Sequence, residues 1–190
     1  MIIIGILGEI GSGKSYVAKQ FGYPVFNADK EVTEIYKKNK VCFNKLKKLL
    51  PNNIKTFPID KAELTNAILT NKKNIKKISK IVHPFVRKKM NLFLLKNQKR
   101  KIVILDVPLL LENKINNKEM ILIFVDSKKS DILSRLSKRK SFNSKLFKKL
   151  KEIQLPLDYK KRQSHFIIKN YYTKKFVRKS IKNILKDILK

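Results

Sequence analysis

The chain has 190 residues, of which 43% are hydrophobic, and a formal net charge of +32 at pH 7. This length and apolar content are typical of one globular domain with its own core, and no apolar run approaches the roughly 18 residues of a membrane-spanning helix. No basic segment precedes the first apolar stretch, and there is a single cysteine. We therefore expect neither a signal peptide nor an internal disulfide, and we expect a cytoplasmic protein.

The positive charge comes mainly from lysine, because only six of the 46 basic residues are arginines. Proteins that read nucleic acids usually gather arginine and aromatic side chains on one element. Lysines scattered along the chain instead favour a compositional bias that covers solvated faces, and they would still speed the encounter with polyanionic small molecules. We expect no nucleic-acid and no membrane partner, and a monomer or a weak homo-oligomer.

The first element predicted is a strand over 2–7, where every residue but one is apolar, as in a fully buried parallel strand. The following residues, 8–15, fit the pattern G-x-x-x-x-G-K-[ST], and apolar residues at helical spacing follow over 15–21. Glycines let such a loop curl so that successive N–H groups point at an anion at the N-terminus of the helix. The pattern predicts a site for a nucleoside triphosphate.

Two side chains of this loop have chemical roles in the pattern. Lys14 reaches the β- and γ-phosphates, and the Ser15 hydroxyl is a ligand of Mg²⁺. We therefore predict ATP as co-substrate with Mg²⁺. The predicted nucleotide-binding residues are Gly11, Ser12, Gly13, Lys14, Ser15 and Tyr16.

A second, short strand is predicted over 23–27, and Ala28-Asp29 follows it. Helices are expected over 30–38 and up to Leu50, and Asp60 can cap another. The helical period then continues to Val82. Pro84 would interrupt a continuous helix, so we expect a boundary at His83 and a new helix that begins at Pro84 and ends around Asn97.

The second half of the chain adds further apolar strands. Residues 102–105 and 120–125 read as buried strands that end at Asp106 and Asp126, with a turn of helix over 108–112 between them. A helix over 129–138, a polar stretch, a helix through Leu150 and Ile153, and a last strand over 165–168 follow. The C-terminal helix should pack one apolar stripe on the sheet: Phe176, Val177, Ile181, Ile184, Leu185, Ile188 and Leu189.

Strands that alternate with helices predict an α/β fold: a doubly wound, mainly parallel sheet of about five strands with helices on both faces. Ligands of such sheets bind beyond the carboxyl ends of the strands. Gly8, Asp29 and Asp106 each follow a predicted strand end, so we expect them to share one edge of the sheet.

The loop alone does not separate an ATPase, a GTPase and a small-molecule kinase. No N-K-x-D signature of guanine recognition is present and the chain is short for a motor, which leaves a small kinase. Asp29 could deprotonate an acceptor hydroxyl or cap a helix. Asp106 could hold Mg²⁺ directly or through water. Arg135 and Arg139 could be cations of a mobile lid or could lie on a solvated helix face.

Six strings taken together carry a resemblance to a known family. They are GEIGSGKS, NADKEV, HPFVRKKM, LDVPLLLEN, RLSKR and EIQLPLDYKKRQSHFIIKN. In this order and spacing the chain resembles the dephospho-coenzyme A kinases from Ile2 to Asn170. The resemblance implies a P-loop NTPase fold like that of the nucleoside-monophosphate kinases. It also implies transfer of the ATP γ-phosphate to the ribose 3′-hydroxyl of dephospho-coenzyme A, the final step of coenzyme A biosynthesis.

The resemblance also assigns residues. It maps Asp29 onto the catalytic base, places His83, Pro84 and Arg87 in helices that bind the acceptor, and places Arg139 in the lid. With Lys14, Asp29 and Arg139 are the predicted catalytic residues. The implied single kinase domain, 1–190, has a core at 1–58, 100–137 and 164–190, acceptor-binding helices at 59–99 and a lid at 138–163.

Several positions depart from the family pattern: Glu9, Tyr16, Thr33, His165 and Tyr171. Neither Glu9 nor Thr33 removes an essential group of the mechanism, although the absence of an arginine at Thr33 would weaken binding of the acceptor phosphate. Two rival functions are a nucleoside or nucleoside-monophosphate kinase of the same architecture and an ATPase stimulated by nucleic acid.

Overall fold

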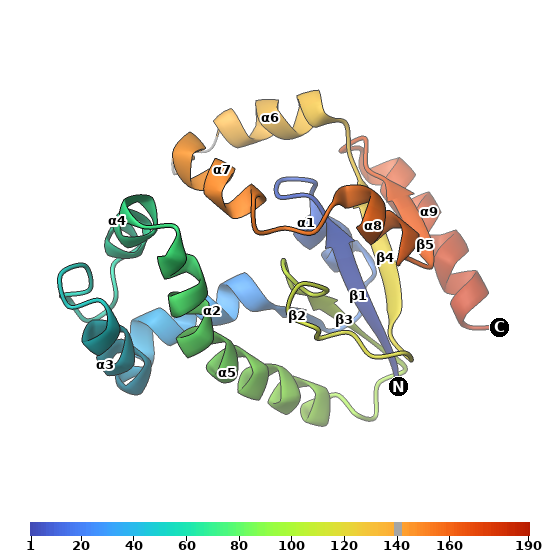
Figure 1. Ribbon diagram of the computed structural model, residues 1–190. Coiled ribbons are helices and arrows are strands. Elements are labelled where there is room, and N and C mark those ends of the chain that lie inside the picture. The colour runs from blue at the N-terminus through green and yellow to red at the C-terminus, as the bar shows by residue number, and fades with distance from the viewer. Residues whose placement is uncertain (139–141) are drawn as a thin grey trace. The chain divides into compact units, whose positions relative to one another are not determined.

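A computed structural model describes residues 1–138 and 142–190 of the chain (Figure 1). It divides into two compact units. We call Met1–Asn27, Asn97–Phe142 and Ile153–Lys190 the sheet unit, and Ala28–Lys96 with Asn143–Glu152 the helical unit. None of the helices in the described ranges has the length and apolar content needed to cross a membrane.

The sheet unit contains five parallel strands in the order β2-β3-β1-β4-β5, which confirms the predicted fold class. Figure 1 shows β1 among them with its loop at one end. The strands are β1 (Ile2–Gly8), β2 (Val25–Asn27), β3 (Ile102–Asp106), β4 (Ile121–Asp126) and β5 (Phe166–Lys169). Because all of them run the same way, their last residues lie along one carboxyl edge, where Asn27 stands opposite Asp106 in register.

The strands form because their apolar, mostly β-branched residues are buried on both faces of the sheet. Every residue of β3 is buried. Helices α1 (Lys14–Gln20) and α9 (Lys174–Ile188) cover one face and share a core with β1, β3 and β4. The apolar stripe of α9 is shorter than predicted: Phe176 and Leu189 are 56% and 47% exposed, because they lie at the two ends of the helix.

The second face is covered closely by the segment after β3. A Cβ atom on Gly5 would lie 2.9 Å from Leu110 Cδ1 and 2.9 Å from Met120 Sδ, so only glycine allows this approach in the middle of β1. The predicted helical turn over 108–112 is instead a set of hydrogen-bonded turns. Helix α6 (Lys129–Ser137) follows β4 as expected, whereas α8 (Leu157–Arg162), which contacts β1, was not predicted because it is short and polar.

The helical unit has a separate apolar core. Its helices are α2 (Ala28–Lys38), α3 (Lys40–Leu49), α4 (Lys61–Thr70), α5 (Lys73–Lys96) and α7 (Ser144–Lys151). The predicted cap is present, since Asp60 accepts a hydrogen bond of 2.9 Å from the Ala62 N–H at the start of α4. Cys42 is a buried member of this core, and burial raises the pKa of its thiol to about 11.

One predicted boundary is wrong. Helix α5 runs without interruption from Lys73 to Lys96 and contains Pro84 in its interior. Proline removes one main-chain hydrogen bond and crowds the preceding turn, which usually ends a helix. Here Ile78 and Val82 before Pro84 and Met90 after it are all buried, so packing along the whole length outweighs the local cost.

Candidate active site

The phosphate loop joins β1 to α1. Gly13 is the residue before the helix, with φ 87°, and a Cβ atom there would come within 2.5 Å of Asn170 Nδ2. Both the left-handed backbone and the close neighbour therefore require glycine. The Val17 N–H donates to the Gly13 carbonyl at 3.0 Å, which leaves the N–H groups before it at the open N-terminus of α1. Such a group of donors is suited to a phosphate.

Lys14 is 9% exposed and lies across the loop. Its Nζ donates to the carbonyl oxygens of Gly8 at 3.2 Å and Glu9 at 2.8 Å. The backbone carbonyl groups hold the ammonium group of Lys14 in place, so a bound phosphate would meet a cation that is already positioned.

Three side chains hold the carbonyl groups of this loop. Ser127 Oγ and Asn170 Nδ2 both donate to the Ser12 carbonyl at 2.9 Å. Tyr172 Oη donates to the Gly11 carbonyl at 3.1 Å. Because the N–H and C=O of a trans peptide point in opposite directions, holding the Ser12 carbonyl on this side turns the next N–H group to the other side.

These three residues were not predicted as site residues, although Asn170 is part of the last matching string. Ser127 directly follows β4, and Asn170 and Tyr172 follow β5. Their positions just beyond strand ends of a parallel sheet are the signal that could have identified them.

Asp106 ends β3 and is almost completely buried at the carboxyl edge. The Asn27 Nδ2 group, at the end of β2, donates to Asp106 Oδ2 at 2.5 Å and fixes the orientation of the carboxylate. Ser15 is exposed in the first turn of α1. A carboxylate and a hydroxyl are the hard oxygen donors that Mg²⁺ prefers, and the residues the structure describes contain no cluster of three or more His, Cys, Asp or Glu for a metal.

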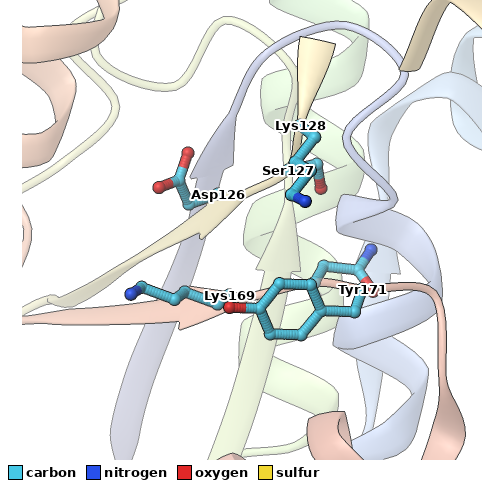
Figure 2. A pocket seen from close by; sticks show the side chains of 6 residues that line it. Asp126, Ser127, Lys128, Lys169 and Tyr171 are labelled. Carbon is cyan, nitrogen blue, oxygen red and sulfur yellow. The ribbon is translucent and has the colours of Figure 1, made fainter. Parts of the chain in front are cut away.

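A pocket of about 220 Å³ lies beside the loop, at the ends of β4 and β5 (Figure 2). Its walls include Ser127 and Asn170, the two side chains that hold the Ser12 carbonyl. Figure 2 shows Asp126 and Lys169 on the two neighbouring strands. The other lining residues are Lys128 and Tyr171.

In the helical unit, Asp29 is exposed in the first turn of α2, and its carbonyl accepts a hydrogen bond of 2.9 Å from Thr33 Oγ1. Helix α2 begins at Ala28, so the alternative prediction that Asp29 caps this helix is wrong. The carboxylate is accessible for contact with a substrate. An acidic side chain in a first helical turn is also favoured by the helix dipole.

The predicted acceptor residues lie on α5. His83 is half-buried, while Pro84 and Arg87 are exposed. Burial lowers the pKa of His83, and the nearby charge of Arg87 lowers it further, so the imidazole is mostly neutral at pH 7. Arg139 lies outside the described residues. Arg135 lies on α6, where its guanidinium carbon is 4.2 Å from the centre of the Tyr172 ring.

Comparison with known proteins decides the family. A protein-family model described as "Dephospho-CoA kinase" matches residues 2–175. The chain belongs to the dephospho-CoA kinase family. A relative named dephospho-CoA kinase from Wolbachia pipientis wMel is 33% identical over 192 residues, which covers 98% of each chain.

Solved structures agree with the fold. A protein from Thermus thermophilus has a TM-score of 0.80 and 25% identity, and the match covers 100% of this chain and 98% of the other. A dephospho-CoA kinase from Campylobacter jejuni has a TM-score of 0.64 and 22% identity, covering 98% and 96%.

One departure from the family pattern has a structural account. His165 Nδ1 accepts a hydrogen bond of 3.0 Å from the Leu122 N–H, so this side chain supplies an acceptor to the start of β4, as an aspartate would. Tyr16 and Tyr171 are exposed.

Proposed function

We propose that this protein transfers the γ-phosphate of ATP to the ribose 3′-hydroxyl of dephospho-CoA. Members of its family phosphorylate dephospho-CoA with ATP in the final step of coenzyme A biosynthesis. The observation that carries the proposal is the phosphate loop of the sheet unit, in which side chains hold the Gly11 and Ser12 carbonyl groups; this arrangement supports binding of a triphosphate at the loop amides.

The donor half of the site uses Lys14 and the backbone amides of Gly11, Ser12, Gly13, Ser15 and Tyr16. The Ser12 N–H donates to the Glu9 carbonyl at 3.1 Å, so it would have to exchange this partner for a phosphate oxygen. Lys14 Nζ exchanges the carbonyl groups of Gly8 and Glu9 for oxygens of the β- and γ-phosphates. The positive charge of the lysine then stabilises the negative charge on the phosphoryl group in the transition state. Such electrostatic stabilisation supplies most of the rate enhancement of phosphoryl transfer.

Ser15 and Asp106 are the residues that would hold Mg²⁺. Their oxygen donors suit this ion, and a magnesium site of a kinase commonly has only one or two protein ligands, with phosphates and water as the others. Bound there, Mg²⁺ would neutralise phosphate charge. The hydrogen bond from Asn27 keeps the Asp106 carboxylate oriented for this task.

Asp29 is the proposed base for the acceptor. Its carboxylate accepts the proton of the 3′-hydroxyl while the new O–P bond forms and the bond between the γ-phosphorus and the bridging oxygen of ADP breaks. The exposed position of Asp29 in the first turn of α2 supports this role.

The remaining assignments concern the acceptor and the lid. His83, Pro84 and Arg87 bind dephospho-CoA from α5, where a neutral imidazole donates or accepts a hydrogen bond and the guanidinium pairs with a phosphate. Arg139 neutralises the transition state. We retain the division into a core, acceptor-binding helices at 59–99 and a lid at 138–163, within one kinase domain in the cytoplasm.

The test is an assay of the purified chain with Mg²⁺, ATP and dephospho-CoA, in which mass spectrometry detects the phosphorylated product. We expect one coenzyme A per ADP. Shikimate, nucleosides and nucleoside monophosphates serve as alternative acceptors, and better turnover with any of them overturns the proposal.

The same assay separates the nucleic-acid-dependent ATPase. That function predicts ATP hydrolysis that DNA or RNA stimulates and that salt strongly reduces. We expect no stimulation. Sedimentation of the same sample tests the expected monomer or weak homo-oligomer.

A further inference from the structure

Tyr172 has a backbone conformation that is unusual for a residue other than glycine. Its φ is 57°, in the left-handed region that residues other than glycine avoid. A non-glycine residue persists there only where its surroundings hold it in place, and such residues concentrate at functional sites. The question is therefore what holds Tyr172 and what it does in return.

Three contacts fix this residue, all within the sheet unit. Its N–H donates to Asn170 Oδ1 at 2.9 Å, its hydroxyl donates to the Gly11 carbonyl at 3.1 Å, and the Arg135 guanidinium lies over its ring at 4.2 Å. The left-handed backbone is what lets a residue two positions beyond Asn170 turn back to the phosphate loop.

Asn170 connects the same contacts to the next peptide of the loop. The side chain is 1% exposed, and while its Oδ1 accepts from Tyr172, its Nδ2 donates to the Ser12 carbonyl at 2.9 Å. The Gly11 and Ser12 carbonyls are thus both held from the segment after β5. The Ser12 N–H of the first peptide donates to the Glu9 carbonyl at 3.1 Å, so the bond to the Gly11 carbonyl holds the turn of the loop. The bond to the Ser12 carbonyl turns the Gly13 N–H of the next peptide to the opposite side, where a nucleotide would bind.

We propose that Tyr172 is a positioning residue of the phosphate loop: its hydroxyl holds the Gly11 carbonyl, and with it the turn of the loop that binds ATP, and its ring links the loop to α6 through Arg135. Helix α6 leads directly into the segment predicted to be the lid. The proposal rests on the proposed function only in that the loop binds ATP, and it does not depend on the identity of the acceptor.

The experiment measures the Kd of ATP by calorimetry for the full chain and for Tyr172→Phe, which removes one hydroxyl and keeps the ring. Loss of a hydrogen bond of ordinary strength predicts a Kd about 3- to 10-fold higher. The matched control is Tyr23→Phe, the same chemical change at a residue just before β2, at the opposite edge of the sheet. An unchanged Kd in Tyr172→Phe, or an equal rise in Tyr23→Phe, overturns the proposal.

A steady-state assay separates positioning from a general structural role. We expect Tyr172→Phe to raise the KM for ATP by a similar factor while the KM for the acceptor stays constant. A fall in kcat alone, with both KM values unchanged, indicates a loss of folded enzyme and contradicts the proposal. If the acceptor proves not to be dephospho-CoA, the Kd of ATP still gives the answer, so the two failures are distinguishable.

The link to α6 has its own test. Arg135→Ala should raise the Kd of ATP about 2- to 5-fold in the unmodified chain, the size expected of a cation over an aromatic ring. In a Tyr172→Gly background, where the ring is absent and the backbone is relaxed, Arg135→Ala should add nothing. Equal effects of Arg135→Ala in the two backgrounds contradict the link.

Discussion

The phosphate loop and the helical unit present their functional groups in opposite ways. In the loop, hydrogen bonds from Ser127, Asn170 and Tyr172 hold the Gly11 and Ser12 carbonyl groups, and the buried Lys14 is held by its own bonds to the Gly8 and Glu9 carbonyls. In the helical unit, the side chains of Asp29 and Arg87 project from exposed positions on separate helices. Under the proposed function, ATP therefore binds a site set by backbone geometry, whereas binding of the acceptor depends on individual side chains. Substitutions should expose this difference.

The largest effect is expected at Lys14, whose side chain is proposed to contact the phosphates. Lys14→Ala should reduce kcat/KM by at least about 10³-fold, because it removes a preorganised cation from the transferring group. Lys19→Ala, an exposed lysine on the same helix, is the control and should leave activity unchanged. Appreciable turnover in Lys14→Ala would show that the backbone amides of the loop support phosphoryl transfer without the lysine, and would contradict the prediction.

Asp29→Asn should reduce kcat by about 10² or more, the usual contribution of a positioned acid–base group. The Kd of ATP should not change. Glu31→Gln alters a carboxylate in the same first turn of α2 and controls for the effect of charge on the helix dipole. Near-normal turnover in Asp29→Asn would remove the residue from the mechanism.

A buried ion pair in the sheet unit should affect stability more than the exposed pairs do. Lys160 Nζ lies 2.6 Å from Glu112 Oε1, with the lysine 1% exposed, and the same oxygen accepts from the Leu155 N–H at 3.0 Å. Lys160→Met leaves a buried carboxylate without its cation and should lower the free energy of unfolding by about 3–5 kcal/mol, measured in urea.

The neighbouring Lys161 provides the control for that prediction. It pairs with Asp126 at 3.3 Å, but both side chains are more than a third exposed, so Lys161→Met should cost less than about 1 kcal/mol. Equal losses in the two variants would mean that burial does not govern these pairs. If combining Lys160→Met with Glu112→Leu restores stability, the unpaired buried carboxylate is the cause of the loss.

The smallest effect is expected from His83 in the helical unit. Burial and Arg87 lower its pKa in the folded state, so between about pH 6.5, its unfolded value, and the lower folded value, the unfolded chain binds more protons. Stability therefore falls as pH drops through this window. His83→Gln should reduce the fall in Tm between pH 7 and 5 by less than about 3 °C. A steeper fall in the variant would contradict the sign.

The phosphate loop was predictable because eight consecutive residues encode it, and the strands because β1, β3 and β4 are continuous apolar runs. Pro84 misled the prediction because a local rule was outweighed by packing at residues before and after it. The residues that hold the loop were missed for a different reason. Tyr172 and Ser127 are each more than a hundred residues away in sequence from the loop residue that they bond. A polar residue after a strand does not show in the sequence which residue it will bond.

The order of the strands has a consequence for synthesis of the chain. Among the strands that the structure describes, β1 is synthesised before its partners: it pairs with β3, with Ile2 opposite Ile102, and with β4, with Ile4 opposite Ile121. This apolar strand therefore stays unpaired while about a hundred further residues, which include α2 to α5, are synthesised. Such distant pairing slows folding and exposes intermediates to aggregation. The lysines, spread along the whole chain, would keep such intermediates apart by mutual repulsion.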